Sequence, residues 1–199
     1  GVFGFFISTD LFTMFMFYEV ALIPMYLLIG VWGSGQKEYA AMKLTLMLMG
    51  GSAFLLIGIL GIFYGAGGDT MNLLEIAQRH IPTEMQNLFF PLIFLGFGVL
   101  GALFPFHTWS PDGHASAPTA VSMLHAGVLM KLGGYGCFRV AMFLMPEGAE
   151  MWGNFFLVLT TISVVYGAFS AVVQTDLKYI NAYSSVSHCG LVLFALLMM

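Results

Sequence analysis

Apolar residues run along this chain in long blocks that short polar stretches separate. The hydrocarbon core of a bilayer is about 30 Å thick, so a helix needs about 20 mostly apolar residues to cross it. Measured against that length, the pattern predicts a partial span at residues 1–7 and six further spans, of which the last is most or all of a span. These six lie at about residues 10–32, 40–64, 87–109, 117–145, 152–173 and 179–199.

One connection is longer than the rest. It covers residues 65–86, and within it the apolar residues between Met71 and Arg79 recur at helical spacing. An amphipathic helix of this kind lies along the membrane interface rather than crossing it. The whole pattern therefore predicts an all-α fold, a polytopic transmembrane helical bundle that forms one membrane domain over residues 1–199.

Composition supports the same class. Of the 199 residues, 59% are hydrophobic and 8% are charged, and mean hydropathy is +0.91. Soluble domains carry about 25% charged residues, so this chain has too little polar surface to face water all round, and the lipid bilayer is its expected surrounding. The net charge of −4 is spread along the chain and gives no reason to expect nucleic acid as a partner. Because residue 1 is Gly and the last residues are still apolar, we interpret the chain as a segment of a longer protein.

Basic residues fall on both sides of the predicted membrane. Lys37, Lys43 and Lys178 lie on one side, and Arg79 and Arg139 lie on the other among several acidic residues. Short loops rich in Lys and Arg stay in the cytoplasm. We therefore expect the three-lysine side to face the cytoplasm, with the chain in the bacterial cytoplasmic (inner) membrane or its equivalent.

The span at 87–109 contains residues that disrupt helices. Glycines at 96, 98 and 101 precede Pro105, which removes a backbone donor and clashes with the carbonyl four residues earlier. The sequence therefore predicts a helix break at Pro105. At membrane depth a break is tolerated only where protein or trapped water satisfies the freed backbone groups. This favours an ion pathway beside the break over a kink that serves packing alone.

Two ionisable residues lie deep inside predicted spans. Lys131 lies about half-way along residues 117–145, where a charge costs roughly 2.5–3.5 kcal/mol on insertion scales. Glu19 lies within the span 10–32 and has no basic residue three or four positions away on its own helix. Burial favours the protonated carboxyl and the neutral amine. Both residues are therefore candidate proton carriers, and the alternative is a structural Glu–Lys pair that fixes helix register.

His125 lies six residues before Lys131 on the same predicted helix. Histidine titrates near neutral pH, which suits a proton relay, although an isolated one is more often a satisfied core residue. At a rise of about 1.5 Å per residue, the two side chains lie about 9 Å apart along the axis. Water or another side chain must therefore bridge them if both carry protons.

Four more basic residues are secondary candidates, for the pathway or for the membrane interface: Lys43, His107, Lys178 and His188. Lys178 lies at a loop-to-helix boundary, which favours anchoring of its ammonium at the interface, and Lys43 allows the same interpretation. The histidines at 107, 114 and 188 have no i, i+4 pairing, and we interpret Asp112, the nearest acid, as a loop residue. The sequence therefore predicts no metal site. It also offers no redox centre and no cofactor-binding loop, since the glycines at 133, 134 and 136 follow no strand.

Several stretches together resemble one family. They are Phe104 to His114, Ala117 to Ala120, Leu129 to Gly136, Tyr18 to Tyr26 and Thr175 to His188. The set is similar to the M-type antiporter-like membrane subunit of proton-pumping NADH:quinone oxidoreductase, respiratory complex I, over essentially the whole chain. The large subunits of multisubunit cation/proton antiporters share much of it.

The resemblance implies a large all-helical subunit of two inverted repeats, each with a broken helix, around a central hydrophilic axis. This chain would supply most of the first repeat and the opening of the second. Glu19 matches the family's key glutamate, which couples neighbouring subunits, and Lys131 matches the lysine of the helix after the broken one. Other membrane subunits, including neighbouring antiporter-like ones, are the implied partners. NADH, flavin, iron–sulfur clusters and quinone belong to other parts of such a complex, so no cofactor is expected on this chain.

One position departs from the family pattern. The family usually carries a pumping lysine in the broken helix, and Leu100 stands at that position here. Leucine cannot hold a proton. Either Lys131 and His125 take over the step, or the subunit has lost or altered one channel.

Together these observations predict a proton-translocating membrane subunit of an NADH:quinone oxidoreductase, an enzyme complex whose redox active site lies outside this chain. Protons would move through Glu19, Lys131, His125 and water while quinone is reduced elsewhere. Two alternatives stay open. One is a cation/proton antiporter subunit, and the other is a structural subunit with a degenerate pathway, for which Leu100 is the main support.

Overall fold

The structure, a computed structural model, describes all residues from 1 to 199. It contains helices joined by loops and no strand beyond an isolated bridge between Asp10 and Asn72, so the predicted all-α class is confirmed. In chain order the elements are α1 (Val2–Ile7), α2 (Leu11–Trp32), α3 (Lys37–Gly65), α4 (Leu73–Ala77), α5 (Thr83–Leu100), α6 (Trp109–Ser116), α7 (Thr119–Leu124), the π-helix η1 (His125–Leu129), α8 (Met130–Gly136), the π-helix η2 (Cys137–Met142), α9 (Pro146–Val173) and α10 (Leu177–Leu197).

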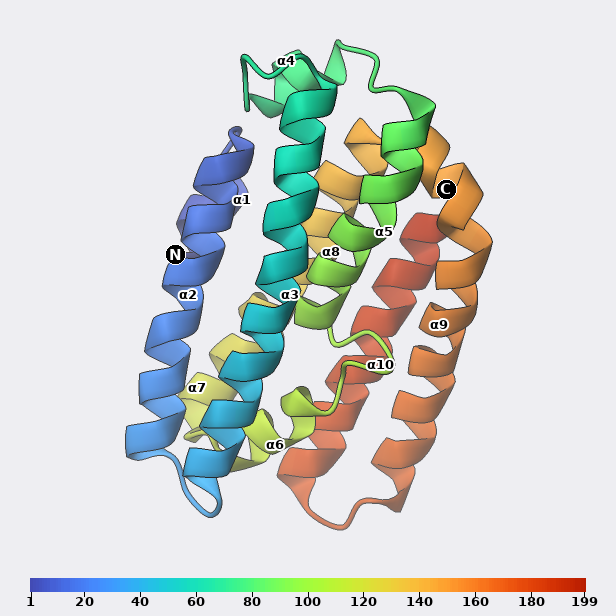
Figure 1. The fold of residues 1–199 in the computed structure, drawn as a ribbon. Helices are drawn as coiled ribbons and strands as arrows, with labels where there is room; N and C mark the ends of the chain where they lie inside the picture. Colours follow the sequence, from blue (N-terminus) through green and yellow to red (C-terminus); the bar gives the residue numbers. More distant parts are fainter.

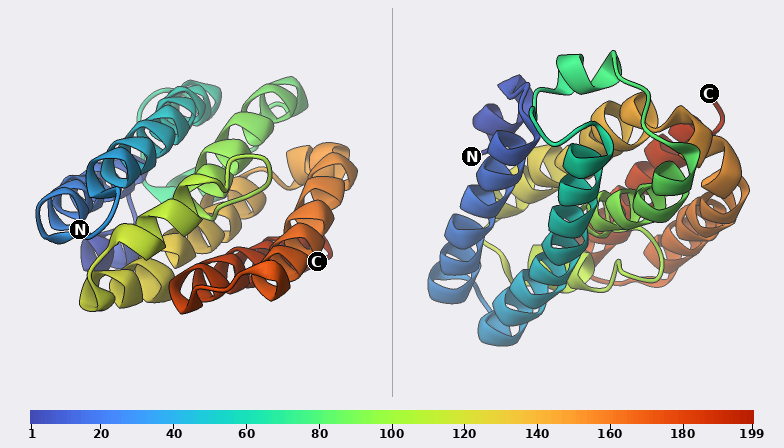
Figure 2. Two further views of the ribbon diagram at one scale, coloured as in Figure 1. Left: turned by 90° about the horizontal axis from the view of Figure 1, so that it is seen from below. Right: turned by 45° about the horizontal axis from the view of Figure 1, so that its top comes forward.

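The long helices run up and down in one bundle (Figure 1). α2 and α3 lie at one side and α9 and α10 at the other, with α5 and the segment from α7 to η2 between them (Figure 2). The loops that join α2 to α3 and α9 to α10 lie at one end, which we call the lysine end because Lys37 and Lys178 follow these loops. α4 lies at the opposite end, together with Arg79.

Five helices are long and apolar enough to cross a membrane: α2, α3, α5, α9 and α10. The segment from Thr119 to Met142 is one continuous helical run in which η1 and η2 widen the turn. α9 begins at Pro146, earlier than the expected start at 152, because a proline with its fixed φ suits the first turn of a helix.

α5 stops at Leu100 through a Schellman motif. The Leu103 N–H donates to the Gly98 carbonyl (2.8 Å), and the Ala102 N–H donates to the Val99 carbonyl (3.1 Å). Ala102 takes the left-handed conformation that this motif needs, with φ of 56°. Glycine usually occupies that position, because a Cβ makes the conformation costly.

Pro105 lies exposed in the loop of residues 101–108 that follows. The sequence predicted a break at Pro105, and the helix instead ends at Leu100, where the Schellman motif closes it. After the loop the chain forms α6, which the prediction had not separated from its neighbours. The expected span at 87–109 is therefore one helix, α5, which ends at Leu100 and is followed by a non-helical stretch up to the start of α6 at Trp109.

The long connection between α3 and α5 crosses one end of the bundle (Figure 2). Its short helix α4 begins at Asn72, whose side chain accepts a hydrogen bond from the Leu74 N–H (3.0 Å). Backbone bonds from Leu11 to Met71 (3.0 Å) and from Leu73 to Thr9 (2.8 Å) fasten it to the start of α2.

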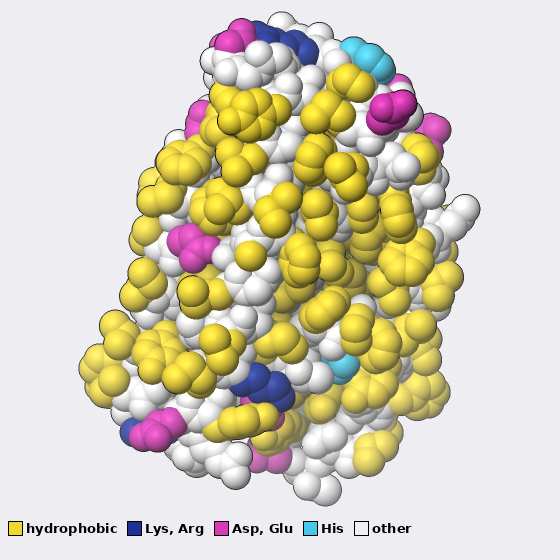
Figure 3. Space-filling model, in the orientation of Figure 1, with side chains coloured by type: hydrophobic (Ala, Val, Ile, Leu, Met, Phe, Trp, Pro, Cys, Tyr) yellow, Lys and Arg dark blue, Asp and Glu magenta, His cyan; other side chains and the backbone are white.

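Apolar side chains cover the sides of the bundle, and charged side chains gather mainly toward its two ends (Figure 3). Large hydrophobic residues are exposed along every long helix, for example Phe169 and Val172 on α9. A surface of this kind is suited to lipid or to other membrane helices rather than to water. The distribution fits a chain that crosses a bilayer several times.

Candidate functional site

Trp109, the first residue of α6, ties the two halves of the broken helix together. Its indole Nε1 donates to the carbonyl of Val99 (3.1 Å), in the last turn of α5. The Val99 carbonyl also accepts the Ala102 N–H, so the indole adds a second bond to a carbonyl at the end of the helix. The indole is buried and stacks on His125 of η1, with centroids 5.2 Å apart and planes at 12°. Trp109 therefore places His125 against the break.

His125 also stacks on His114 of α6. Their ring centroids are 4.3 Å apart and the planes are at 10°. A Cβ at Gly113 would lie 3.1 Å from Cε1 of His125, so the glycine leaves room for the ring. Trp109, His125 and His114 form a stack of three rings, which we call the histidine stack.

Three ring nitrogens in the histidine stack have no hydrogen-bond partner: both nitrogens of His125 and Nε2 of His114. Nδ1 of His114 lies 2.9 Å from the Ser122 hydroxyl. Buried polar atoms are nearly always satisfied, and internal water supplies the bond where protein does not. The three nitrogens can therefore bond to internal water, and each neutral ring has one nitrogen that can accept a proton.

A polar cavity of about 360 Å³ joins the lysine end to the histidine stack. It is lined by His114, Thr119, Ser122, Met123, Ala126, Lys178, Asn181, Ser184 and Ser185. Hydroxyl, amide and ammonium groups from α7 and α10 therefore face the same space, and His114 borders it from α6.

Lys131 is exposed on the surface of this chain, whereas the sequence had indicated a buried side chain. No other helix of the chain covers its face of α8, so the ammonium turns back along its own helix and donates to the Ala126 carbonyl (2.7 Å). Ala126 belongs to η1, and π-helical turns are frequent at functional sites. Ala126 is also one of the residues that line the polar cavity, so the Lys131 ammonium is bonded to a residue at the cavity's edge.

A second, small cavity of about 70 Å³ lies on the other side of Lys131. It is lined by Lys131 together with Gly101 at the break and Cys189 of α10, among others. Lys131 therefore lines a cavity that reaches the break, and it forms no ion pair within the chain.

Glu19 is half-buried on α2, and no cation of the chain pairs with it. Its Oε1 is enclosed and has no hydrogen-bond partner. Within this chain Glu19 does not pair with Lys131, whose ammonium donates to the Ala126 carbonyl. The neighbouring Tyr18 fixes the helix, since its hydroxyl donates to the Leu48 carbonyl of α3 (3.0 Å).

Two lysines hold α6 at its ends. Lys43 of α3 pairs with Asp112 (2.6 Å), and these side chains are 24% and 28% exposed. Asp112 was expected in a loop, but it lies in the first turn of α6, because a new helix starts at Trp109 after the break. A negative charge is favourable in the first turn of a helix. Lys178 donates to carbonyls at the other end of α6, those of Ala115 (3.2 Å) and Ala117 (3.0 Å). Both ammonium groups therefore bond to α6.

The remaining two histidine candidates, His107 and His188, have different surroundings. His107 lies in the loop 101–108, is 4% exposed, and packs between Phe104 and Tyr166, with centroid distances of 5.5 Å and 4.9 Å. Its Nδ1 is enclosed and has no partner. His188 is exposed on α10. The structure thus places His107 at the break and gives His188 no polar neighbour.

Leu100 is fully buried at the end of α5. α8 approaches this end so closely that a Cβ at Gly133 would lie 2.5 Å from the Gly101 nitrogen and 2.6 Å from the Phe97 oxygen. Small residues allow such backbone contact between membrane helices. Leucine at position 100 is therefore part of a dry, close-packed contact.

Sequence reasoning missed three members of the site: Trp109, Asp112 and His114. All three lie in α6, which was interpreted as the end of one span and a loop. Their spacing would have placed them on a helix, but only if the Schellman end of α5 had been recognised first. No group of three or more His, Cys, Asp or Glu side chains converges as metal ligands would.

Residues 8–199 match a family described as NADH:quinone oxidoreductase/Mrp antiporter, transmembrane. The chain is 43% identical over 194 residues to an NAD(P)H-quinone oxidoreductase chain 4 of Picosynechococcus, covering 97% of this chain and 35% of that protein. It is 41% identical over 197 residues to the chloroplastic NAD(P)H-quinone oxidoreductase chain 4 of Citrus sinensis, covering 98% of this chain and 40% of that protein. The chain thus spans two fifths or less of the length of these relatives.

Two solved structures have the same fold. A chain of respiratory complex I from Thermus thermophilus with bound NADH superimposes with a TM-score of 0.88 at 31% identity, covering 94% of this chain and 40% of that one. A chain of the membrane-bound sulfane sulfur reductase, an archaeal respiratory membrane complex, gives a TM-score of 0.89 at 29% identity, with coverage of 97% and 40%. With its five apolar helices, the chain is an integral, multi-pass membrane protein.

Proposed function

Because the chain belongs to the NADH:quinone oxidoreductase/Mrp antiporter transmembrane family, we propose that it is part of a proton-translocating membrane subunit of an NADH:quinone oxidoreductase complex. Its relatives are named as chains of NAD(P)H-quinone oxidoreductases. On this proposal the chain moves protons, while NADH, flavin, iron–sulfur clusters and quinone are bound by other subunits.

The observation that carries the proposal is the continuous series of polar groups beside the helix break. The polar cavity brings Lys178, Ser122 and His114 to one space. His114 stacks on the enclosed His125, and Ala126, which also lines the cavity, accepts a hydrogen bond from the Lys131 ammonium. Discontinuous helices provide ion sites of this kind near the middle of a membrane. Protons would pass from the lysine end through the cavity to the stack and to Lys131.

The energy that such a step requires is modest. Moving one charge against 100 mV takes about 2.3 kcal/mol. One pKa unit corresponds to about 1.4 kcal/mol, so a swing of about two units in the pKa of Lys131 would cover the step. A change in the distance from Lys131 to a neighbouring charge can produce a swing of this size.

Glu19 would couple this chain to a neighbouring membrane subunit. Its enclosed Oε1 has no partner within the chain. A cation or proton donor of an adjacent antiporter-like subunit would complete the bond, and movement of that group would change the charge of Glu19. The proposal therefore includes other membrane subunits as partners.

The decisive experiment replaces Lys131 by Ala in the assembled complex. We expect fewer protons moved per electron while electron transfer and assembly continue. An unchanged ratio in a normally assembled complex would show that Lys131 does not carry protons.

The runner-up is cation/proton exchange, because the matched family also contains the Mrp antiporters. Sodium uptake by vesicles without any redox substrate would favour that activity. A structural subunit with a degenerate pathway is the third possibility, supported by Leu100 at the usual lysine position. Loss of pumping in Glu19→Gln would exclude it, whereas unchanged pumping in both Glu19→Gln and Leu100→Lys would support it.

A further inference from the structure

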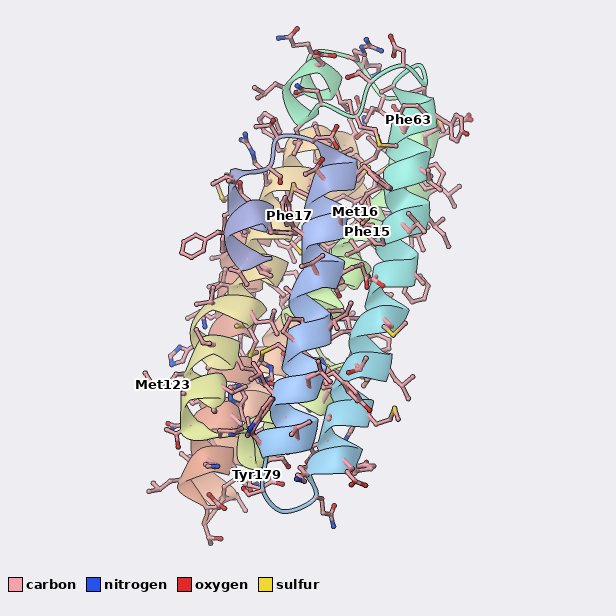
Figure 4. The ribbon with its side chains drawn as sticks, turned by 90° about the vertical axis from the view of Figure 1, so that its left-hand side faces the viewer. Phe15, Met16, Phe17, Phe63, Met123 and Tyr179 are labelled. Atoms are coloured by element: carbon pink, nitrogen blue, oxygen red, sulfur yellow. The ribbon has the colours of Figure 1, made fainter.

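The polar residues around Asp112 do not belong to the route through the histidine stack. A separate pocket of about 210 Å³ opens at the lysine end, and Asp112, Tyr39 and Tyr179 are among the residues that line it. It lies between the α2–α3 loop, α6 and the start of α10, as its lining shows. Figure 4 places Tyr179 close to the loop that joins α2 to α3. Water therefore has access to Asp112 and to the Tyr179 ring.

Two tyrosines lead from this pocket into the bundle. Tyr179 and Tyr183 are one turn apart on α10, so they lie on the same face of the helix, about 6 Å apart along its axis. The Asp112 carboxylate lies close enough for its charge to act on both hydroxyls. The ring of Tyr183 meets Tyr166 of α9 edge to face, with centroids 6.4 Å apart.

Tyr166 connects this pair to the helix break. Its ring lies 4.9 Å from the ring of His107, at an angle of 68°. His107 is buried, and its Nδ1 is enclosed without a partner, so the imidazole presents a free nitrogen inside the break. Lys43, which is paired with Asp112, is the charged side chain close enough to act on this imidazole.

We propose that Tyr179, Tyr183, Tyr166 and His107 form a second proton route, which joins the pocket beside Asp112 to the helix break. The inference rests on the proposed function, because it assigns a further path to the same subunit. In each step a hydroxyl gives its proton to the next oxygen or nitrogen and receives one from the group before it, so no net charge accumulates on a tyrosine. Single water molecules bridge the gaps between the rings, as they do in other polar chains. His107 takes the proton at one nitrogen and releases another from Nδ1.

The route differs from a belt of interfacial aromatic residues in one respect. Tyrosine rings at an interface act through an apolar ring and a wetted hydroxyl together, so phenylalanine there weakens anchoring and assembly rather than proton movement. A proton route needs the hydroxyl oxygen itself. Replacing Tyr166 or Tyr183 by Phe keeps the edge-to-face packing and removes only that oxygen, so the two roles predict different results.

The test uses the complete complex with Tyr166→Phe and Tyr183→Phe, measured for protons moved per electron and for the slowing of pumping in deuterated water. We expect each variant to lose at least half of the proton-to-electron ratio and to show a changed isotope effect, with normal assembly. Tyr64→Phe is the matched control, because Tyr64 is an exposed residue at the far end of α3.

Unchanged ratios and isotope effects in both tyrosine variants would overturn the second route. Lys131→Ala, measured in parallel, separates this failure from failure of the proposed function. If Lys131→Ala abolishes pumping while the tyrosine variants pump normally, only the second route is wrong. If Lys131→Ala also pumps normally, the proposed function is wrong as well.

Discussion

The imidazole rings of His114 and His125 lie nearly parallel with their centroids 4.3 Å apart. His114 borders the polar cavity, whereas His125 is fully enclosed and has Trp109 as its other stacking neighbour. Two like charges at this separation repel strongly, so the pair holds at most one extra proton. The arrangement suits transfer from the wetted ring to the enclosed one.

Replacing His125 by Phe tests this role. The ring of phenylalanine keeps the contact with Trp109 and His114, and only the two nitrogens are lost. We expect the proton-to-electron ratio to fall several-fold while the complex assembles normally. The same substitution at His188, which is exposed on α10, is the control. Equal effects at the two positions would contradict a specific role for His125.

The ion pair between Lys43 and Asp112 should hold α6 against α3. Because both side chains are mostly buried, removal of one partner leaves a charge without its hydrogen bond, which costs about 1.5–3 kcal/mol. We expect Lys43→Met and Asp112→Asn each to lower the unfolding temperature of the solubilised subunit. The double variant should lose less than the sum of the two single losses. Strict additivity would show that the pair does not contribute.

Gly133 should be indispensable for the contact between α8 and the break. A methyl group there meets the backbone of Gly101 and Phe97 at 2.5 Å and 2.6 Å, and backbone atoms cannot move aside cheaply. We expect Gly133→Ala to lower the free energy of unfolding by about 1–3 kcal/mol, the usual cost of overpacking. Gly127→Ala is the control, because no atom lies within 4 Å of a Cβ at that position. Its effect should be neutral or stabilising by up to about 1 kcal/mol, since alanine favours helix.

The loop between α3 and α4 should loosen in acid. The Arg79 guanidinium, hydrogen-bonded to Asp69, holds the pKa of that carboxyl below its usual value. Because the pKa of Asp69 is lower in the folded loop, the pair contributes its full stability above the ordinary carboxyl pKa of about 3.9. This contribution is lost as the pH falls through the lower pKa of the folded loop. The protection of the amides of residues 66–79 against hydrogen exchange, relative to their intrinsic exchange rates at each pH, should therefore fall in that acid range.

Asp69→Asn provides the comparison for that measurement. It removes the titrating group and should leave the loop amides less protected at neutral pH, with a protection factor that does not change with acid in the same range. Identical pH profiles for the two proteins would show that another group controls the loop.

The sequence was sufficient for the class of fold and for most helices, because the length of an apolar block is set by membrane thickness alone. It was less reliable at the break. Pro105 marked the right region, but the helix stops at Leu100 through Ala102, an alanine in a conformation usually given to glycine. No propensity rule selects that residue in advance.

The site shows the same limit. His125 and Lys131 were identified because each is an ionisable residue in an apolar run. Their surroundings depend on α6, which brings His114 and Trp109 to them from another part of the chain. The exposure of Lys131 was not predicted either, since a sequence does not show which face of a helix its neighbours leave open.

The most direct test of the central claim is the proton-to-electron ratio of the assembled complex with Lys131→Arg. Arginine keeps the positive charge and can still donate to the Ala126 carbonyl, but its guanidinium does not release a proton in a protein. If Lys131 carries protons, the arginine variant should assemble normally and pump as poorly as Lys131→Ala. Full pumping by the arginine variant would contradict the account, because a fixed charge would then be sufficient.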